Sequence, residues 1–279
     1  MRATAFLLLA AVLTLTSPHS NAADAEAPQL YTLDCGRLDV ADMGEFSDTG
    51  EHSGEIGSLA APCFLIHHGR DWLLWDTGLG DDIAAHPNGV ERFGYHFTVR
   101  STLRAQLAML GLKPADIGFV ALSHLHADHS GNIGLFPKAT FLMSAKELAW
   151  ARRKPAPGGI APALIAPLAR ARVKATDQDM DVFGDGSVQI LNGPGHTPGH
   201  RFLLLKLANA GAVLLSGDLF HTRENYQKGL MPPDNWSRAE TLASFNRFAG
   251  IQRFTNARVI VQHAEEDIAA LPPFPSFLD

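Results

Sequence analysis

The sequence predicts an α/β or α+β domain with at least one mixed β-sheet. Short apolar runs typical of strands recur between residues 30 and 261, and segments with helical periodicity lie between them. Two of the strand-like runs are separated by only four residues, which predicts an antiparallel hairpin. Strands mixed with helices, together with a hairpin, indicate a mixed sheet rather than an all-α or all-β fold.

The composition is that of an ordinary globular protein. The chain has 279 residues, of which 46% are hydrophobic and 19% charged, and its formal net charge is −6. These values exclude a disordered chain, a collagen and a disulfide-dense miniprotein. The mild acidity argues against a nucleic-acid partner, because a broad nucleic-acid surface needs a basic patch. We expect residues 23–279 to form a single domain.

The first 22 residues have the features of a secretory signal peptide. Arg2 gives the positive start, Ala5–Leu15 is apolar except for Thr14, and Ser20–Ala22 precedes the expected cleavage site. A membrane anchor is the alternative, but the apolar run has about 11 residues and a membrane span needs about 20. We therefore expect residues 1–22 to be removed. The mature protein is expected to be secreted or periplasmic, without stable insertion into a membrane.

The first half of the chain predicts several strands and one helix. The expected strands lie at residues 30–35, 62–67, 72–76 and 119–122. Residues 81–95 are expected to form a loop because glycine and proline punctuate them. Leu103, Leu107 and Leu110 share one face of a helix that ends at Gly111.

The second half adds two helices with a serine at each N-cap. Ser144 with Glu147, and Ser237 with Glu240, have the spacing of capping boxes. The first helix is expected to run through Arg153, before a proline- and glycine-rich excursion at 155–167. On the second helix, the residues expected to face inward are Leu242, Phe245 and Phe248. Further strands are expected at 188–191, 202–207, 212–215 and 258–261.

The two cysteines lie on expected strands. Cys35 ends the first strand and Cys63 begins the apolar part of the second. An oxidising compartment permits a disulfide between them, and two buried thiols are the alternative. The sequence leaves both possibilities open.

The strongest motif is a metal-ligand pattern at residues 124–129, with the sequence His-Leu-His-Ala-Asp-His. Imidazole nitrogens and carboxylate oxygens are good ligands for zinc and similar divalent ions. The alternation directs His124 and His126 to the same side of an extended segment. A turn just after them can direct Asp128 and His129 toward a second position nearby.

Three more candidate ligands follow later strands. His196, Asp218 and His263 each lie within a few residues of the end of an expected strand. Alone, each would be a hydrogen-bonded structural residue, but strand ends that meet at one edge of a sheet bring such residues together. The sequence therefore predicts a metal site at the edge of the fold.

These motifs resemble the metallo-β-lactamase superfamily. The resemblance is carried by Leu74–Gly78, residues 124–129, Gly195–His200, Gly217-Asp218 and His263. It implies an αββα four-layer sandwich with a dinuclear metal site at one edge of the two sheets. It also implies a first metal held by His124, His126 and His196, a second held by Asp128, His129 and His263, and a bridging ligand in Asp218. Asp76 is expected to support the ligands rather than bind metal.

Within the superfamily, the chain is most similar to the N-acyl homoserine lactonases. The segment Asp218–Tyr226 resembles the one these enzymes carry after the bridging aspartate. They usually have a tyrosine three residues after that aspartate, whose phenol is thought to contact the lactone carbonyl. This chain has His221, whose imidazole can donate a similar hydrogen bond. A structural role for His221 away from the substrate is the alternative.

The resemblance implies a hydrolase with two divalent metal ions, zinc being the expected metal. A hydroxide that bridges the ions would attack the ester bond of a lactone, such as an N-acyl homoserine lactone. Asp128 would carry a proton to the leaving group. The partner is thus a small-molecule ester, and a homodimer is compatible with the sequence. Seven aromatic residues in loops are expected to serve local packing rather than a substrate wall: Phe46, Phe93, Tyr95, Phe97, Phe220, Tyr226 and Trp236.

Several other functions use a similar ligand set. The alternatives are an exported phosphotriesterase, thioesterase or β-lactamase-type hydrolase, an iron-dependent oxidoreductase, and a zinc-binding protein without turnover. A complete ligand set with a candidate proton carrier argues against the last. Metal content and ester hydrolysis measured on the same sample would separate these classes.

Overall fold

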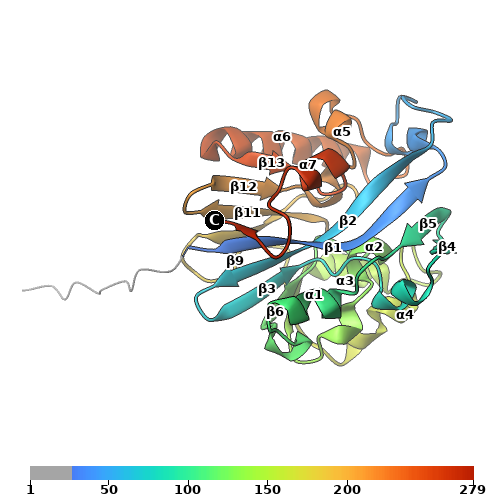
Figure 1. Ribbon diagram of the computed structural model, residues 1–279. Coiled ribbons are helices and arrows are strands. Elements are labelled where there is room, and N and C mark those ends of the chain that lie inside the picture. The colour runs from blue at the N-terminus through green and yellow to red at the C-terminus, as the bar shows by residue number, and fades with distance from the viewer. Residues whose placement is uncertain (1–26) are drawn as a thin grey trace, which may run out of the picture.

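Two β-sheets pack face to face, and helices cover the outer face of each (Figure 1). The computed structural model describes residues 27–279, so the predicted signal peptide at 1–22 lies outside the described residues. The αββα arrangement implied by the resemblance is confirmed. No helix within 27–279 is both long and apolar enough to cross a bilayer.

The larger sheet has nine described strands and is mixed, as predicted. The pairs that join β1, β2 and β3 are antiparallel, and the pairs that join β3, β6, β7 and β8 are parallel. From one edge to the other, its strands are β4 (Val90–Arg92), β5 (Tyr95–Thr98), β1 (Gln29–Val40), β2 (Gly57–His68), β3 (Asp71–Trp75), β6 (Phe119–Ala121), β7 (Thr140–Met143) and β8 (Arg172–Ala175), with β14 (Phe277–Leu278) paired to β1.

The smaller sheet has five described strands. All its pairs are antiparallel except β12 with β13. Its order is β13 (Arg258–Ile260), β12 (Gly211–Leu215), β11 (Arg201–Leu207), β10 (Val188–Asn192) and β9 (Met180–Asp181).

The central core lies between the sheets because successive side chains of a strand point to opposite faces. On β2, Phe64 and Ile66 pack with Leu203 and Leu215 of the smaller sheet. Their neighbour Leu65 points the other way, toward the helices that cover the larger sheet. A strand buried on both faces must be apolar at consecutive positions, which explains the uninterrupted run in the sequence.

The helices form the two outer layers. Those over the larger sheet are α1 (Leu103–Met109), α2 (Ala127–Ser130), α3 (Ala145–Ala151) and α4 (Pro162–Ile165). Those beside the smaller sheet are α5 (Arg223–Lys228), α6 (Arg238–Thr255) and α7 (Glu265–Ala269). Short 3-10 helices lie at η1 (Met43–Phe46), η2 (Asp81–Ala85), η3 (Pro114–Asp116), η4 (Ile133–Leu135), η5 (Ala166–Ala169) and η6 (Gly217–Leu219).

Two sequence predictions about elements were wrong. The expected loop at 81–95 contains η2, β4 and the start of β5. Pairing stabilises these short edge strands, because β4 pairs with β5 and β5 pairs with β1. On α6, Leu242 is exposed, whereas Thr241 and Ser244 face inward beside Phe248. The reason is a polar contact: Ser244 donates a hydrogen bond from Oγ to the carbonyl of Pro194 at 2.6 Å. The small polar side chains therefore set the inward face of the helix.

The two cysteines form a disulfide. Cys35 and Cys63 are bonded, their Cα atoms are 5.6 Å apart, and both side chains are buried between β1 and β2. This separation is in the normal range for a disulfide. Of the two possibilities that the sequence left open, the structure contains the bridge.

Candidate metal centre

All seven predicted ligands lie at one edge of the two sheets. His124 follows β6, and His126, Asp128 and His129 lie at the start of α2 or within it. The other three come from the smaller sheet and follow strands β10, β12 and β13: His196, Asp218 and His263. Two separate sheets therefore contribute to the same edge.

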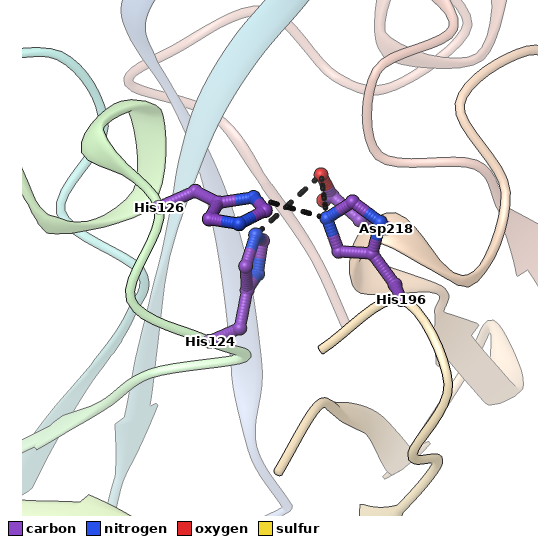
Figure 2. Close-up of side chains that lie close together, drawn as sticks. All are labelled: His124, His126, His196 and Asp218. Carbon is purple, nitrogen blue, oxygen red and sulfur yellow. Dashed lines mark hydrogen bonds and ion pairs between the residues drawn. The ribbon is translucent and has the colours of Figure 1, made fainter. Parts of the chain in front are cut away.

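The first group consists of His124, His126, His196 and Asp218 (Figure 2). One ligand atom from each lies within 4.8 Å of those of the others. His196 Nε2 is 3.1 Å from His126 Nδ1 and 3.5 Å from Asp218 Oδ2, and His124 Nε2 is 3.7 Å from the same oxygen. Figure 2 shows the three imidazoles pointing toward one space beside the carboxylate.

The second group consists of Asp128, His129, Asp218 and His263. His129 Nε2 and His263 Nε2 are each 3.0 Å from Asp218 Oδ1. Asp128 Oδ2 lies 3.5 Å from His129 Nε2 and 3.7 Å from His263 Nε2. Asp218 thus directs Oδ2 to the first group and Oδ1 to the second, so a single carboxylate joins the two.

The chemistry of these groups fits divalent cations. His124 Nε2 is buried without a hydrogen-bond partner among residues 27–279, and leaving such an atom unsatisfied costs free energy. His129 Nε2 and His263 Nε2 lie 3.2 Å apart, closer than two unshielded nitrogen lone pairs would favour. Imidazole nitrogens with carboxylate oxygens are the donors that zinc and related ions take in proteins. The ligand role of each residue stays a prediction.

The pKa directions also indicate a cation site. Burial lowers the pKa of His124 and His126 well below its usual value and that of His196 to about 4, so these imidazoles are neutral as a metal ligand must be. Burial lowers the pKa of His129 and His263 too, but the nearby carboxylates, Asp218 first and Asp128 with it, together outweigh burial and leave both pKa values raised. The two carboxylates of the second group, Asp128 and Asp218, therefore favour a positive charge between them, which a bound cation would supply.

Asp76 supports the second group from behind, as expected. Its buried carboxylate accepts hydrogen bonds from His129 Nδ1 at 2.9 Å, from Gln262 Nε2 at 2.6 Å and from the backbone N–H of Ser123 at 2.7 Å. Within the described part of the chain, His129 is the one candidate ligand with which Asp76 forms an ion pair. A carboxylate behind a histidine fixes the ring orientation and increases its basicity.

His200 holds the backbone of Asp218, a contact that the sequence did not predict. Its Nδ1–H donates to the carbonyl of Gly193 at 2.8 Å, so Nε2 accepts the backbone N–H of Asp218 at 2.9 Å. A Cβ on Gly217, whose φ is +53°, would lie 2.6 Å from His200 Nε2. The sequence signal for this contact is present in the Gly-His-Thr-Pro-Gly-His run, but nothing in the spacing shows which atom His200 contacts.

His221 lies inside the site rather than on the surface. Its Nε2 is 3.4 Å from Asp218 Oδ2, and its buried Nδ1 has no hydrogen-bond partner in the described residues. Its ring contacts Phe46 at a centroid distance of 4.8 Å. Of the two placements considered for His221, the structure favours the one beside the candidate ligands.

A cavity of about 690 Å³ opens above both groups. Asp128, Asp218 and His221 line it together with aromatic and other apolar side chains. Five of the seven loop aromatics line it: Phe46, Phe93, Tyr95, Phe97 and Trp236. The expectation of local packing holds for Phe220 and Tyr226, which pack with Phe248, and for Phe46 and Phe97, which are buried in a further core cluster with Tyr95 packed against it. Phe93 and Trp236 are exposed residues that line the cavity.

Comparison with known proteins places the chain in a family. Residues 56–259 match the sequence model of the metallo-beta-lactamase superfamily. The chain belongs to this superfamily. The chain is 30% identical over 263 residues to the N-acyl homoserine lactonase AttM of Azorhizobium caulinodans. The alignment covers 90% of this chain and 98% of the relative. The predicted resemblance and the prediction of a metal-dependent hydrolase are thus confirmed.

Solved structures of superfamily members share the fold. A crystal structure of a quorum-quenching N-acyl homoserine lactone lactonase has a TM-score of 0.78 at 24% identity, covering 91% of this chain and 99% of that one. AidC, a dizinc quorum-quenching lactonase in complex with a product, has a TM-score of 0.67 at 21% identity, covering 91% and 90%. At these low sequence identities, the structural similarity shows that this chain shares their fold.

Proposed function

We propose that this superfamily member opens the ester bond of a lactone, with N-acyl homoserine lactones as the substrate class. The observation that carries the proposal is one buried carboxylate, Asp218, which two ligand groups share and which lines a cavity with aromatic side chains. The relatedness to AttM over 90% of the chain supports the same substrate class.

The protein residues divide between two ion positions. His124, His126 and His196 would hold one ion, Asp128, His129 and His263 the other, and Asp218 would bridge them. Two ions held there would supply a nucleophilic hydroxide from water near neutral pH and Lewis acidity toward the lactone carbonyl. Zinc is the proposed metal because the donor set suits it and the structurally similar AidC is a dizinc lactonase.

Asp128 is the proposed proton carrier to the leaving alkoxide. It lines the cavity, and its side chain is 15% exposed, whereas that of Asp218 is 4% exposed. A carboxylate that is open to the substrate and beside the bridging position can receive a proton there and release it to the departing oxygen.

His221 is the proposed hydrogen-bond donor to the substrate carbonyl. It lines the cavity, and its Nε2 lies 3.4 Å from Asp218 Oδ2, beside the carboxylate that the two ligand groups share. A donor directed at the carbonyl stabilises the negative charge that develops on its oxygen during attack.

The aromatic walls are proposed to hold the acyl chain. Phe93, Phe97 and Trp236 line the cavity. Each methylene buried there contributes about 0.8 kcal/mol. Affinity is therefore expected to rise with chain length until the cavity is full.

We also propose export of the mature chain, residues 23–279, as one domain. The predicted signal peptide and the disulfide between Cys35 and Cys63 support this location, since disulfides persist in oxidising compartments. Size-exclusion chromatography of the mature chain would test for the homodimer that the sequence allows.

A substrate panel tests the proposed function. The zinc-loaded mature chain is assayed by pH-stat with an N-acyl homoserine lactone, a thioester, a phosphotriester and a β-lactam. The expected result is rapid acid release with the lactone and little with the others. Turnover of only the other substrates would overturn the proposed function while leaving the metal centre in place.

A further inference from the structure

A carboxylate outside the ligand set links the two loops that carry the three histidines of the first group. Glu147 lies on α3, and its side chain is buried, with 1% of the residue exposed. Its Oε1 accepts the backbone N–H of Leu125 at 3.0 Å, and its Oε2 accepts the backbone N–H of Gly199 at 3.0 Å. Each oxygen therefore holds a different loop.

These loops belong to different sheets. Leu125 lies between His124 and His126 in the loop after β6 of the larger sheet. Gly199 lies three residues after His196 in the loop from β10 to β11 of the smaller sheet. The three histidines of the first group are divided between the same two loops: His124 and His126 lie on one and His196 on the other. The Glu147 carboxylate therefore spans the gap between them.

We propose that Glu147 is a positioning residue that sets the separation of these loops and thereby the affinity of the first metal position. This inference rests on the metal centre of the proposed function. The first position depends on it more than the second, because neither Asp128, His129 nor His263 lies on the β10–β11 loop.

The contacts require a carboxylate rather than an amide. Both partners are N–H donors, so both side-chain oxygens must accept. A glutamine would offer one acceptor and turn its NH₂ group toward the other N–H. Gly199, whose N–H Glu147 accepts, is packed closely against α3. A Cβ there would lie 2.3 Å from Ser144 Oγ and 2.5 Å from the Glu147 backbone nitrogen.

The position of Glu147 is costly, which argues against simple packing. Its spacing from Ser144 predicts a capping box, and Ser144 Oγ does accept the Glu147 N–H at 3.2 Å. The Glu147 carboxylate, however, turns away from the helix N-terminus toward the loops. Burial raises the pKa of Glu147 to about 7, so the buried carboxylate carries a desolvation cost that its two hydrogen bonds to the loops offset.

Glu147→Gln tests the proposal, with Asp177→Ala as the matched control. Asp177 Oδ1 accepts hydrogen bonds from Ser144 Oγ at 2.7 Å and from the backbone N–H of Lys146 at 3.1 Å. It therefore anchors the same end of α3 but contacts neither ligand loop. Zinc content after dialysis is measured by mass spectrometry, zinc affinity by chelator competition, and folding by circular dichroism and thermal melting.

We expect wild type and Asp177→Ala to retain two ions. Glu147→Gln is expected to keep its fold but to bind one of the two ions about 10- to 100-fold more weakly, as for other residues behind metal ligands. A folded Glu147→Gln that binds both ions as tightly as wild type overturns the proposal. If Glu147→Gln does not fold, Glu147→Asp replaces it, because the shorter carboxylate cannot reach both loops. Wild-type affinity for both ions in Glu147→Asp would be equally decisive against the proposal.

The same experiment separates this inference from the proposed function. A wild type that binds two ions but opens no lactone overturns the proposed function, while selective loss of one ion in Glu147→Gln still supports the role of Glu147.

Discussion

Asp218 is the residue on which both ligand groups depend, because its two oxygens face different groups. Asp218→Ala should therefore lower the metal content from two ions per chain to less than one after dialysis. Asp71→Ala, on the exposed hairpin at the start of β3, should keep both ions. Mass spectrometry of the dialysed proteins measures the difference. Two tightly held ions in Asp218→Ala would contradict the bridging role.

His221 should affect turnover without affecting metal content. His221→Phe removes a hydrogen-bond donor and is expected to lower kcat for lactone opening about 100-fold. His221→Tyr restores a donor and should recover most of the activity. Steady-state kinetics on proteins with matched zinc content provide the measurement. Unchanged kcat in His221→Phe would assign His221 a structural role.

At the residue scale, the sequence predicts candidate ligands that follow strand ends. It does not predict side chains that accept hydrogen bonds from distant backbone N–H groups. His196 and His263 are recognisable because each follows a strand that ends at the same edge. Glu147 and His200 contact N–H groups 22 and 18 residues away, respectively, through the tertiary fold. No local spacing encodes such a contact.

At the scale of elements, the packing of α3 on the β10–β11 loop makes a glycine necessary. Gly199→Ala would place a Cβ 2.5 Å from the Glu147 backbone nitrogen and should lower the free energy of unfolding by about 3 kcal/mol. At Gly250, within α6, an added Cβ would meet no neighbouring atom of the described residues within 4 Å, so Gly250→Ala should raise the free energy of unfolding by about 1 kcal/mol. Urea denaturation measures both. Equal effects of the two substitutions would contradict this account of the contact.

Strong local patterns predicted elements better than weak ones. The hairpin of β2 and β3 and the N-caps at Ser144 and Ser237 follow from apolar runs and capping residues. The edge strands β4 and β5 have three and four residues and gain their order from pairing, which the sequence does not show. Hydrophobicity alone misplaces Leu242 on α6, because Ser244 forms the buried hydrogen bond that orients the helix.

At the scale of the whole molecule, the disulfide joins two central strands of the larger sheet. Cys35 and Cys63 are 28 residues apart, and closing a loop of this size should stabilise the fold by about 3.5 kcal/mol. A reductant should lower the free energy of unfolding of the mature chain by this amount. Cys35→Ala/Cys63→Ala should show no response to reductant. Equal stability of oxidised and reduced wild type would contradict a stabilising bridge.

The mixed α/β class follows from the order of apolar and helical patterns, but the four-layer arrangement came from the family resemblance. Which sheet faces which is decided by the alternate faces of strands such as β2, where Phe64 and Leu65 pack in different layers. A run apolar at every position does not specify which face meets the second sheet.

The central claim is that two sheets meet at one edge to hold a pair of cations through a shared Asp218. The most direct test is the number of metal ions per chain in the folded, disulfide-bonded mature protein purified without chelator and supplied with zinc. We predict two ions per chain, with lactone opening lost on chelation and regained when zinc is restored. A folded chain that binds no more than one ion would contradict the account.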